Sequence, residues 1–477
     1  MKKIRIIVTS VLFLVILIGG VAYFLTTNGS ASDQSNKNNI ASTKTTLPIP
    51  EILEDENPDD DQAEYHLTAQ KSSKTFVRGI ETETYGYNGD YLGPVIRAKK
   101  GEEVTVHIQN DLGEEETTVH WHGLEIPGDV DGGPHQVIAP DESMTTKFTI
   151  SQRAATLWYH PHPLHKTGEQ VYKGLAGLLL IEDEVSQSLP IPDDYGVNDF
   201  PLIIQDRNLN EDGQLSYNLN MMSMMHGMEG DTPLVNGAYD ADLEVPRGKV
   251  RLRLLNGSNA RVSQFHLEDG AEFWQIASDG GFLEKPVKMD HLVLGPSERA
   301  EVIVDFSLYE RGKRIELQDQ DVRLMNFIVG DEPTESTEIP EQLTRVNHID
   351  PTEVSTVREF VLQGMGPHVN INGKQMDMDR IDEEIDWNET EIWEVSNPRN
   401  RMSMEHPFHV HGVQFQVLER NGEDPPENEQ GWKDTVLLMP GEDVKLIATF
   451  KQKGVFMYHC HILEHEDAGM MGQFQVE

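Results

Sequence analysis

EEVTVHIQN, residues 102–110, is the stretch that decides the fold, because it returns twice more along the chain. Its counterparts are GKVRLRLLN at 248–256 and ETEIWEVSN at 389–397. Each copy alternates apolar side chains with others, as at Val104 and Val106, and a period of two is typical of a half-buried β-strand. Every copy ends in an asparagine: Asn110, Asn256 and Asn397.

A second block follows each of these copies in the same order. It reads PDESMTTKFTI at 140–150, PSERAEVIVDF at 296–306 and PGEDVKLIATF at 440–450, with copies about 145 residues apart. Each block has an acidic residue two positions after its proline and then a strand pattern. The acidic residues are Glu142, Glu298 and Glu442. The repeat predicts an all-β protein of three homologous sandwich domains.

A length of 477 residues also suggests about three domains. We place domain one at 63–185, domain two at 186–345 and domain three at 346–477. Residues 32–62 are rich in Ser, Asn, Thr, Asp and Pro and predict a flexible linker.

The N-terminus predicts export. Lys2, Lys3 and Arg5 precede a mostly apolar run at 6–25, which predicts an apolar helix with the rest of the chain outside the cytoplasm. Residues 1–31 are a signal peptide or a membrane anchor, since Gly29-Ser30-Ala31 is an acceptable cleavage site. If uncleaved, 6–25 is the only expected membrane contact, at the outer face of the cytoplasmic membrane; otherwise the protein is extracellular.

The charge and cysteine content exclude several classes. Acidic residues outnumber basic ones 81 to 39, for a formal charge of −42, which argues against a nucleic-acid partner. Such a charge is typical of a solvated surface, although it also attracts cations. The single cysteine, Cys460, excludes a disulfide within the chain, so an exported protein with this one thiol suggests a specific role for it.

Ten of the nineteen histidines fall in four short motifs. Two of the motifs lie in the first repeat and two in the third. On a strand, His-x-His directs both imidazoles to one face, so each motif offers neighbouring nitrogen ligands. The motifs are HWHG (His120, His122), HPH (His160, His162), HPFHVHG (His406, His409, His411) and HCHILEHEDAGM (His459, His461, His465).

Cys460 indicates the metal. With His406, His465 and the thioether of Met470 it forms a two-histidine, one-cysteine set with an axial methionine, which is typical of a blue-copper electron-transfer centre. The alternative, structural zinc, usually has several cysteines and rarely methionine.

The four motifs together resemble those of the multicopper oxidase family, which includes laccases and bacterial copper-efflux oxidases, over residues 62 to the end. The resemblance implies three tandem cupredoxin-like Greek-key sandwiches, reduction of dioxygen to water, and four coppers per chain. It places type 1 copper on His406, Cys460, His465 and Met470. It places type 2 copper on His120 and His409, and the two type 3 coppers on His122, His160 and His461 and on His162, His411 and His459.

The resemblance also implies two acids that supply protons, Asp131 and Glu466. The alternatives are a turn residue before Gly132 for Asp131 and a solvated helix charge for Glu466. The middle repeat has only His266 in the place of a motif, so we expect domain two to bind no such copper and to hold the outer domains in place.

The electron donor is less determined by the sequence. Met221, Met222, Met224, Met225 and Met228 surround His226, and thioethers suit Cu(I); an adaptable apolar segment is the alternative. Met402, Met404 and Glu405 precede His406 and are further candidate Cu(I) contacts, with packing beneath the copper site as the alternative for Met404. The long Met- and His-rich insertion of some copper-efflux oxidases is absent at 364–372, and Met402 stands where such enzymes use Asp. We favour Cu(I) in copper tolerance over a phenol or aromatic amine.

Three other classes share features with this chain. A copper nitrite reductase lacks the paired type 3 histidines, a division-associated structural relative on the same fold tends to lose copper ligands, and copper storage does not explain Cys460 between two histidines. The sequence therefore favours a copper oxidase, which we expect to be a monomer.

Overall fold

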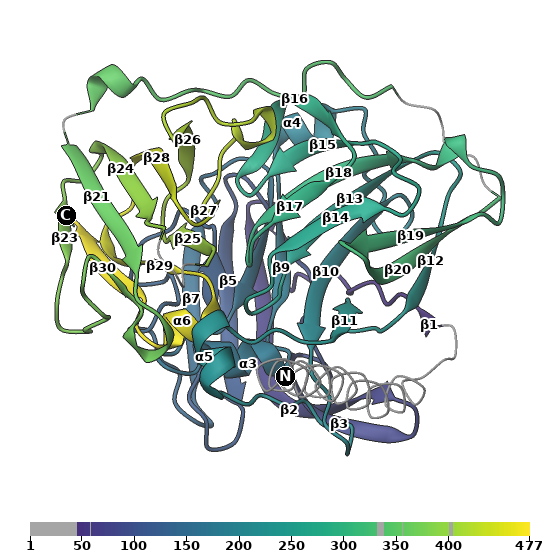
Figure 1. Cartoon of the computed structure of the whole chain (residues 1–477), viewed down its shortest axis with the longest axis horizontal. Coiled ribbons are helices and arrows are strands. Elements are labelled where there is room, and N and C mark those ends of the chain that lie inside the picture. Colours follow the sequence, from purple (N-terminus) through teal and green to yellow (C-terminus); the bar gives the residue numbers. More distant parts are fainter. Residues whose placement is uncertain (1–44, 58, 332–337, 355, 400–403) are drawn as a thin grey trace, which may run out of the picture.

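The computed structural model describes residues 45–477 apart from 58, 332–337, 355 and 400–403. The predicted apolar helix at 6–25, the first part of the linker and Met402 lie outside the described residues. The described strands form six sheets, which sort along the chain into three pairs (Figure 1). The C-terminal pair lies on the left of Figure 1 and the middle pair on the right.

The first pair of sheets contains four strands in each sheet. Its core lies between them and includes Val104 and Val106 from one sheet and Leu157 and Tyr159 from the other. In sheet order the strands are β3 (Ile80–Tyr87), β2 (Gln62–Val77), β5 (Glu103–Asp111) and β7 (Ser143–Thr149), then β4 (Ile96–Lys99), β9 (Gly177–Glu182), β8 (Ala155–His160) and β6 (His120–His122).

The middle pair contains six strands in each sheet, again around one apolar core. One sheet is β11 (Thr232–Val235), β10 (Asp199–Arg207), β13 (Lys249–Asn256), β18 (Arg299–Asp305), β15 (Phe273–Ser278) and β16 (Gly281–Met289). The other is β1 (Thr45–Thr46), β12 (Ala241–Val245), β20 (Val322–Val329), β19 (Arg314–Asp319), β14 (Ser263–Leu267) and β17 (Leu292–Leu294).

The third pair contains five strands in each sheet, and Cys460 lies in the core between them. One sheet is β22 (Asn370–Ile371), β21 (Thr356–Gln363), β24 (Thr390–Asn397), β28 (Glu442–Thr449) and β26 (Phe415–Arg420). The other is β23 (Glu383–Ile385), β30 (Met471–Val476), β29 (Gly454–Cys460), β25 (His406–Val410) and β27 (Thr435–Leu438).

The repeated sequence blocks are confirmed as strands, and they pair in the same way three times. The first blocks are β5, β13 and β24, and each pairs antiparallel with the second block that follows it, β7, β18 and β28. The asparagines that end the first blocks donate side-chain hydrogen bonds to the carbonyls of Ile138, Leu294 and Leu438 at 2.8 to 3.1 Å. Each asparagine therefore ties the end of its strand to the segment that leads into the second block.

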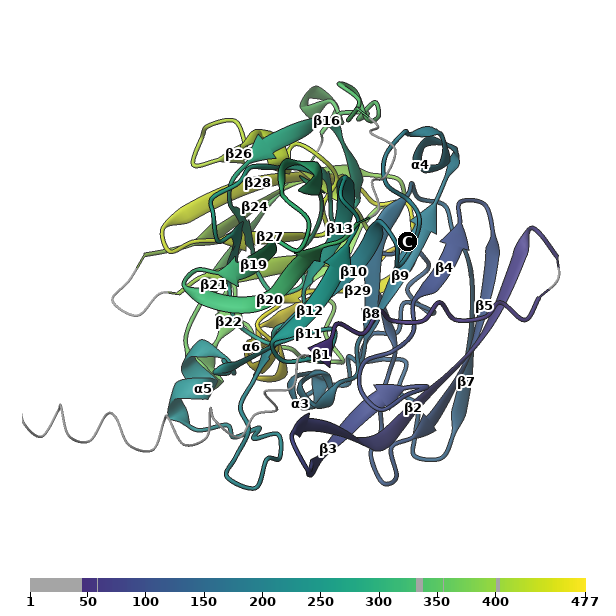
Figure 2. The same cartoon turned by 90° about the vertical axis from the view of Figure 1, so that its right-hand side faces the viewer.

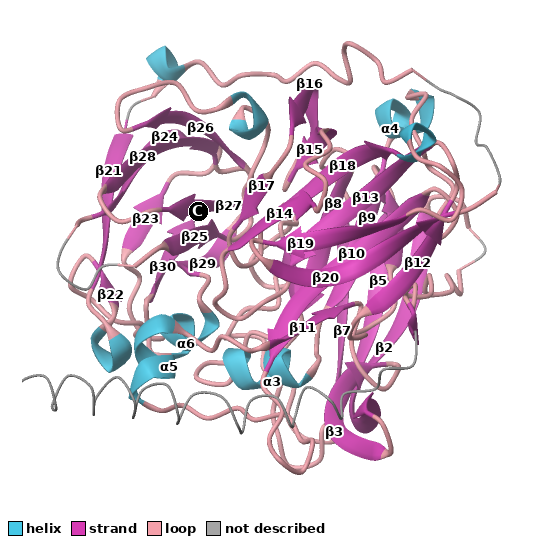
Figure 3. Ribbon diagram, turned by 45° about the vertical axis from the view of Figure 1, so that its right-hand side comes forward, coloured by secondary structure: helices cyan, strands magenta, loops and turns pink. Residues whose placement is uncertain are grey.

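Short helices gather at one edge of the molecule, where α3 (Thr167–Lys173), α5 (Met221–His226) and α6 (Leu463–Asp467) lie together (Figure 3). They come from the three different sheet pairs. The remaining helical segments are α4 (Glu184–Ser188), η1 (Phe306–Leu308), η2 (Pro351–Glu353), η3 (Gly366–His368) and η4 (Glu427–Glu429).

The chain before β2 differs from the flexible linker expected at 32–62. Residues 45 and 46 pair with β12 of the middle sheets, Leu47 is buried in the middle core, and Ile52 bridges to Val95. Figure 2 shows this segment crossing the molecule between β1 and β2. Polar composition alone misses this because the few apolar side chains are the ones that pack. Among the described residues, no helix is both long and apolar enough to span a bilayer.

Candidate metal centres

Strand register brings the motif histidines together within the first sheet pair and within the third. On β6 and β8, His120 lies opposite His160, and on β25 and β29, His409 lies opposite His459. His411 and His461 follow directly after β25 and β29, His162 comes two residues after the end of β8, and all three extend the same rows. The His-x-His spacing therefore acts as the sequence predicts, because alternate residues of a strand share a face.

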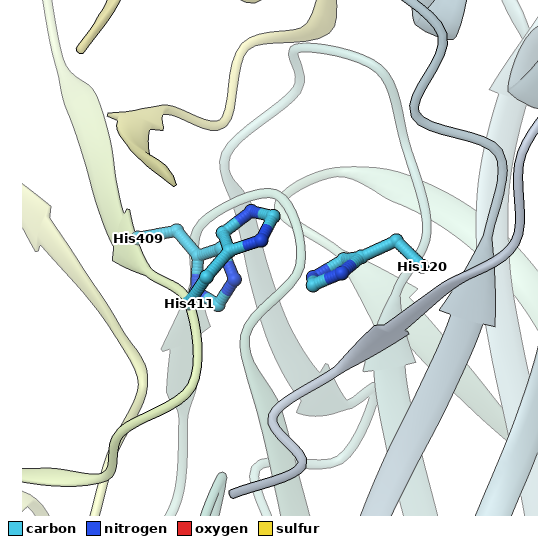
Figure 4. Close-up of side chains that lie close together, drawn as sticks. All are labelled: His120, His409 and His411. Carbon is cyan, nitrogen blue, oxygen red and sulfur yellow. The ribbon is translucent and has the colours of Figure 1, made fainter. Parts of the chain in front are cut away.

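Eight of the ten motif histidines form one buried cluster between the first and third sheet pairs. His120 stacks on His411 with ring centroids 3.8 Å apart, and His122 stacks on His409 at 3.7 Å. Figure 4 shows His409 and His411 on one strand segment facing His120 on another. All eight histidines are at most 1 % exposed. They are His120, His122, His160, His162, His409, His411, His459 and His461.

The histidines of the cluster are in the protonation state that binds a metal ion. Burial, and to a smaller extent neighbouring imidazoles, hold the pKa values of six rings well below the ordinary value, so these rings are neutral and keep a lone pair. These are His122, His160, His162, His409, His411 and His461. Burial also lowers the pKa of His459 to about 3. Neutral imidazole is the form that binds metals.

Orphaned nitrogens show where a metal fits. The Nε2 atoms of His120 and His409 and both ring nitrogens of His461 are buried without a hydrogen-bond partner. An unpaired buried polar atom is costly, and a bound cation would remove that cost. The Nδ1 atoms of His120 and His409 lie 2.9 and 2.8 Å from the carbonyls of Asp131 and Asp434, which fixes each Nε2 toward the cluster.

Asp131 touches the cluster from the loop after HWHG. Its Oδ2 lies 2.7 Å from His411 Nδ1 and 3.3 Å from His120 Nδ1, while its Oδ1 has no partner. Gly132 allows this approach, since it has a φ of 81° and a Cβ there would lie 1.7 Å from the Val119 carbonyl oxygen. Asp131 thus bridges histidines of two domains, which an ordinary turn residue would not do.

Asp434 is a functional residue that the sequence analysis missed. Its Oδ1 lies 3.1 Å from His122 Nε2, and Arg299 of β18 donates to both carboxylate oxygens at 2.7 and 2.6 Å. Gly123 of the HWHG motif makes room for this pair, because a Cβ there would lie 2.5 Å from Asp434 Oδ2. The middle sheet pair therefore reaches the histidine cluster through Arg299, although it contributes no histidine to the cluster. No single-sequence signal links positions 299 and 434.

The second group surrounds Cys460. The thiol lies on the opposite face of its strand from His459 and His461, 3.3 Å from His406 Nδ1 and 3.9 Å from His465 Nδ1. Met470 is also fully buried in this core. Burial raises the pKa of the Cys460 thiol and lowers the pKa of His406 to about 3 and of His465 to about 4. The donor set of two imidazoles, one thiol and one thioether suits copper.

Glu466 faces the histidine cluster from α6. Its two carboxylate oxygens lie 3.3 Å from His162 Nδ1 and 3.2 Å from His459 Nδ1. Burial raises the pKa of Glu466 well above its ordinary value. The side chain is 1 % exposed, so Glu466 is not a solvated helix charge.

The methionine segment is the helix α5, and it lies against the Cys460 group. His465 Nε2 lies 3.1 Å from the Met225 carbonyl oxygen, which directs His465 Nδ1 toward Cys460. Met221 and Met222 are 77 % and 61 % exposed, whereas Met228 is buried. Glu464 holds the segment by accepting hydrogen bonds from the Met228 amide at 2.8 Å and the Tyr217 hydroxyl at 3.0 Å.

Comparison with known proteins agrees with this geometry. Two family models, both described as multicopper oxidase, match residues 68–186 and 341–477. The Staphylococcus aureus protein named multicopper oxidase mco is 43% identical over 441 residues, which is 92% of this chain and 94% of that protein. The chain belongs to the multicopper oxidase family.

Further relatives fit the same family. A laccase structure from Pediococcus acidilactici is 42% identical with a TM-score of 0.87, covering 92% of this chain and 95% of that one. The Escherichia coli cell division protein FtsP is 36% identical over 450 residues, 90% of this chain and 92% of FtsP. This multicopper oxidase is an oxidoreductase that uses oxygen.

Proposed function

We propose that this multicopper oxidase oxidises Cu(I) to Cu(II), one electron at a time, and reduces dioxygen to water with four such electrons. The activity serves copper tolerance outside the cytoplasm. Two features support the proposal. They are the placement of the methionine helix α5 on the ligand His465 and the intact set of twelve donor residues described above.

The donor groups divide among four coppers. We place type 1 copper on His406, Cys460, His465 and Met470. Type 2 copper takes His120 and His409, whose Nε2 atoms are both buried without a hydrogen-bond partner. The two type 3 coppers take His122, His160 and His461, and His162, His411 and His459. Copper in these sites supplies the one-electron steps that link substrate oxidation to dioxygen reduction.

Residues of the chain connect the two groups of copper ligands and provide a proton next to the histidine cluster. Cys460 lies between His459 and His461 in the chain. The backbone bonds from Cys460 to either neighbour therefore connect the Cys460 group to the histidine cluster. Burial raises the pKa of Glu466 and so favours its protonated carboxyl, which places a transferable proton next to His162 and His459. Asp131 holds His411 and His120 from the other side.

The observation that favours Cu(I) is the position of the thioethers. Met221 and Met222 are exposed on a helix whose carbonyl at Met225 contacts His465. Electrons from a donor bound there have a short path to His465. Soft thioethers bind Cu(I) and offer little to a phenol.

The decisive experiment compares substrates in the Met221→Ser/Met222→Ser double variant. We expect kcat/KM for Cu(I) to fall about tenfold, equivalent to ~1.4 kcal/mol of transition-state stabilisation, with turnover of a phenol unchanged. Leu308→Ser, which removes an exposed apolar side chain from the middle sheet pair, is the matched control. Unchanged Cu(I) oxidation in the double variant would overturn the assignment.

A laccase-like oxidation of phenols or aromatic amines is the second candidate, favoured by the identity to the Pediococcus acidilactici laccase. Oxygen consumption with Cu(I), Fe(II) and a phenol side by side separates the two. Export, with residues 6–25 as a signal or anchor, and a monomeric state are further parts of the proposal. Fractionation of cells and light scattering of the purified protein test them.

A further inference from the structure

A histidine pair lies on the outer face of the first sheet pair, away from all four motifs. His66 of β2 and His107 of β5 occupy directly opposed positions in a parallel strand pair. Their neighbours Tyr65 and Val106 point into the core, so both imidazoles point to solvent. Glu64 is two residues before His66 and shares its face. β2, β5 and β7 appear as the purple and blue strands on the right of Figure 2.

These side chains already converge. The rings of His66 and His107 stack with centroids 4.7 Å apart. Glu64 Oε1 lies 2.8 Å from His107 Nε2, and Glu56 Oε2 lies 3.8 Å from His66 Nε2. One ligand atom from each of Glu64, His66 and His107 falls within 4.8 Å of the others.

These separations match a metal site. Two ligand atoms that are each about 2.1 Å from a tetrahedral zinc lie about 3.4 Å apart. Small rotations of exposed side chains therefore bring the three atoms to one ion. Thr145 on β7 orients His107 before any metal binds, because its Oγ1 lies 3.0 Å from His107 Nδ1. His107 Nε2 therefore points toward Glu64.

We propose that Glu64, His66 and His107 bind one divalent first-row transition metal ion, with Glu56 as a fourth ligand. Imidazole and carboxylate suit Cu(II) and Zn(II), and the order of affinities places Cu(II) above Zn(II). The site has no thioether or thiol, so it selects Cu(II) over Cu(I). It is a separate site from the buried centres, because the apolar core between the two sheets lies between them.

The formal charge of −42 adds to this selectivity for cations, since it concentrates them at the surface. Acidic side chains occur over the whole protein, however, whereas the surface pair His66 and His107 occupies one row of one sheet. The test must therefore separate histidine-dependent binding from general attraction to acidic groups.

The test is calorimetric titration of Zn2+ into full-length protein that holds four coppers per chain, after dialysis against a weak chelator has removed copper from the surface. We expect the His107→Ala and His66→Ala variants to lose one zinc per chain. Thr145→Val removes only the group that orients His107 and should weaken that zinc about tenfold. His291→Ala is the matched control, because His291 contacts the Asp290 carboxylate at 2.6 Å without a second histidine, and it should bind zinc as the parent protein does.

Added Cu(II) gives a second readout, since it should produce one further paramagnetic resonance signal per chain that His107→Ala abolishes. Retained blue absorption in every variant shows that the buried centres are intact. Equal zinc stoichiometry and affinity in the His66→Ala/His107→Ala double variant and in the parent would overturn the proposal and leave only attraction to acidic groups.

Discussion

The side chain and backbone of Asp434 contact residues from all three sheet pairs. The carboxylate accepts from Arg299 of the middle pair and lies 3.1 Å from His122 of the first pair, and the carbonyl lies 2.8 Å from His409 Nδ1 in the third. Removing one partner of a buried ion pair costs about 3–5 kcal/mol. Asp434 therefore positions two histidines and balances a buried guanidinium.

The Asp434→Asn variant tests this positioning role. The amide keeps the shape but loses the charge, so we expect weaker copper binding by the eight-histidine cluster, by about 10–100-fold, with blue absorption retained. Copper content after dialysis against a chelator measures the effect. Asp424→Asn, at an exposed loop position, is the matched control. Full copper content in Asp434→Asn would show that Arg299 and the backbone suffice.

Glu466 is expected to act through its proton. In Glu466→Gln the side chain keeps its place between His162 and His459 but can no longer release a proton. We expect blue absorption to persist and reoxidation by dioxygen to slow by about a hundredfold. Stopped-flow reoxidation of the reduced protein measures this rate. A reoxidation rate equal to that of the parent would exclude the role.

The pKa values around Cys460 predict how many protons type 1 copper displaces. His406 and His465, with pKa values of about 3 and about 4, are already neutral above about pH 5, so they release none. The Cys460 thiol, whose pKa burial raises, must lose its proton to bind as thiolate. The affinity of the type 1 site for copper should therefore rise about tenfold per pH unit from about pH 5 to about pH 8.

Calorimetric titration of copper in two buffers of different ionisation enthalpy counts the displaced protons. We expect one proton per type 1 copper. A count near three would mean that the two histidines are protonated in the metal-free protein, which contradicts their depressed pKa values. Cys460→Ser, which lacks the thiol, provides the baseline.

At the scale of elements, α5 depends on Glu464. That carboxylate accepts hydrogen bonds from the Met228 amide at 2.8 Å, from the Tyr217 hydroxyl at 3.0 Å and from Asn259 Nδ2 at 2.8 Å. In Glu464→Gln one acceptor becomes a donor, and an unmatched buried donor costs about 1–3 kcal/mol. We expect faster amide hydrogen exchange over 217–228 and a higher KM for Cu(I), with the blue absorption retained.

Exposed Glu423→Gln is the control for that variant. If exchange over 217–228 is unchanged in Glu464→Gln, the segment is held by other contacts, of which the Met225 carbonyl on His465 is the next to test.

Strands and motifs could be predicted because their signals are local. A period of two in β5, β13 and β24 and the His-x-His spacing each lie within a few residues of sequence. Arg299 and Asp434 meet across 135 positions, and β1 joins the middle sheets although it precedes the first pair, so neither is visible locally. Single acids and arginines on half-buried strands are too common to reveal which of them will meet in the folded chain.

For the whole molecule, contacts between the sheet pairs predict unfolding as one unit. Thr156 donates to Glu301 at 2.6 Å between the first and middle pairs, and Lys433 lies 3.0 Å from Asp279 between the third and middle pairs. The histidine cluster joins the first pair to the third. Losing any one pair would expose these buried polar groups, at a cost of about 1–3 kcal/mol for each hydrogen bond left unmade.

Scanning calorimetry of copper-loaded and copper-free protein tests this cooperativity. We expect one transition in the loaded protein and a lower midpoint after copper removal, because a ligand present at 100 times its Kd adds about 2.7 kcal/mol to the folded state for each site. Resolved separate transitions in the loaded protein would show that the sheet pairs unfold independently. Coincident midpoints with and without copper would contradict metal binding across the interface between the first and third pairs.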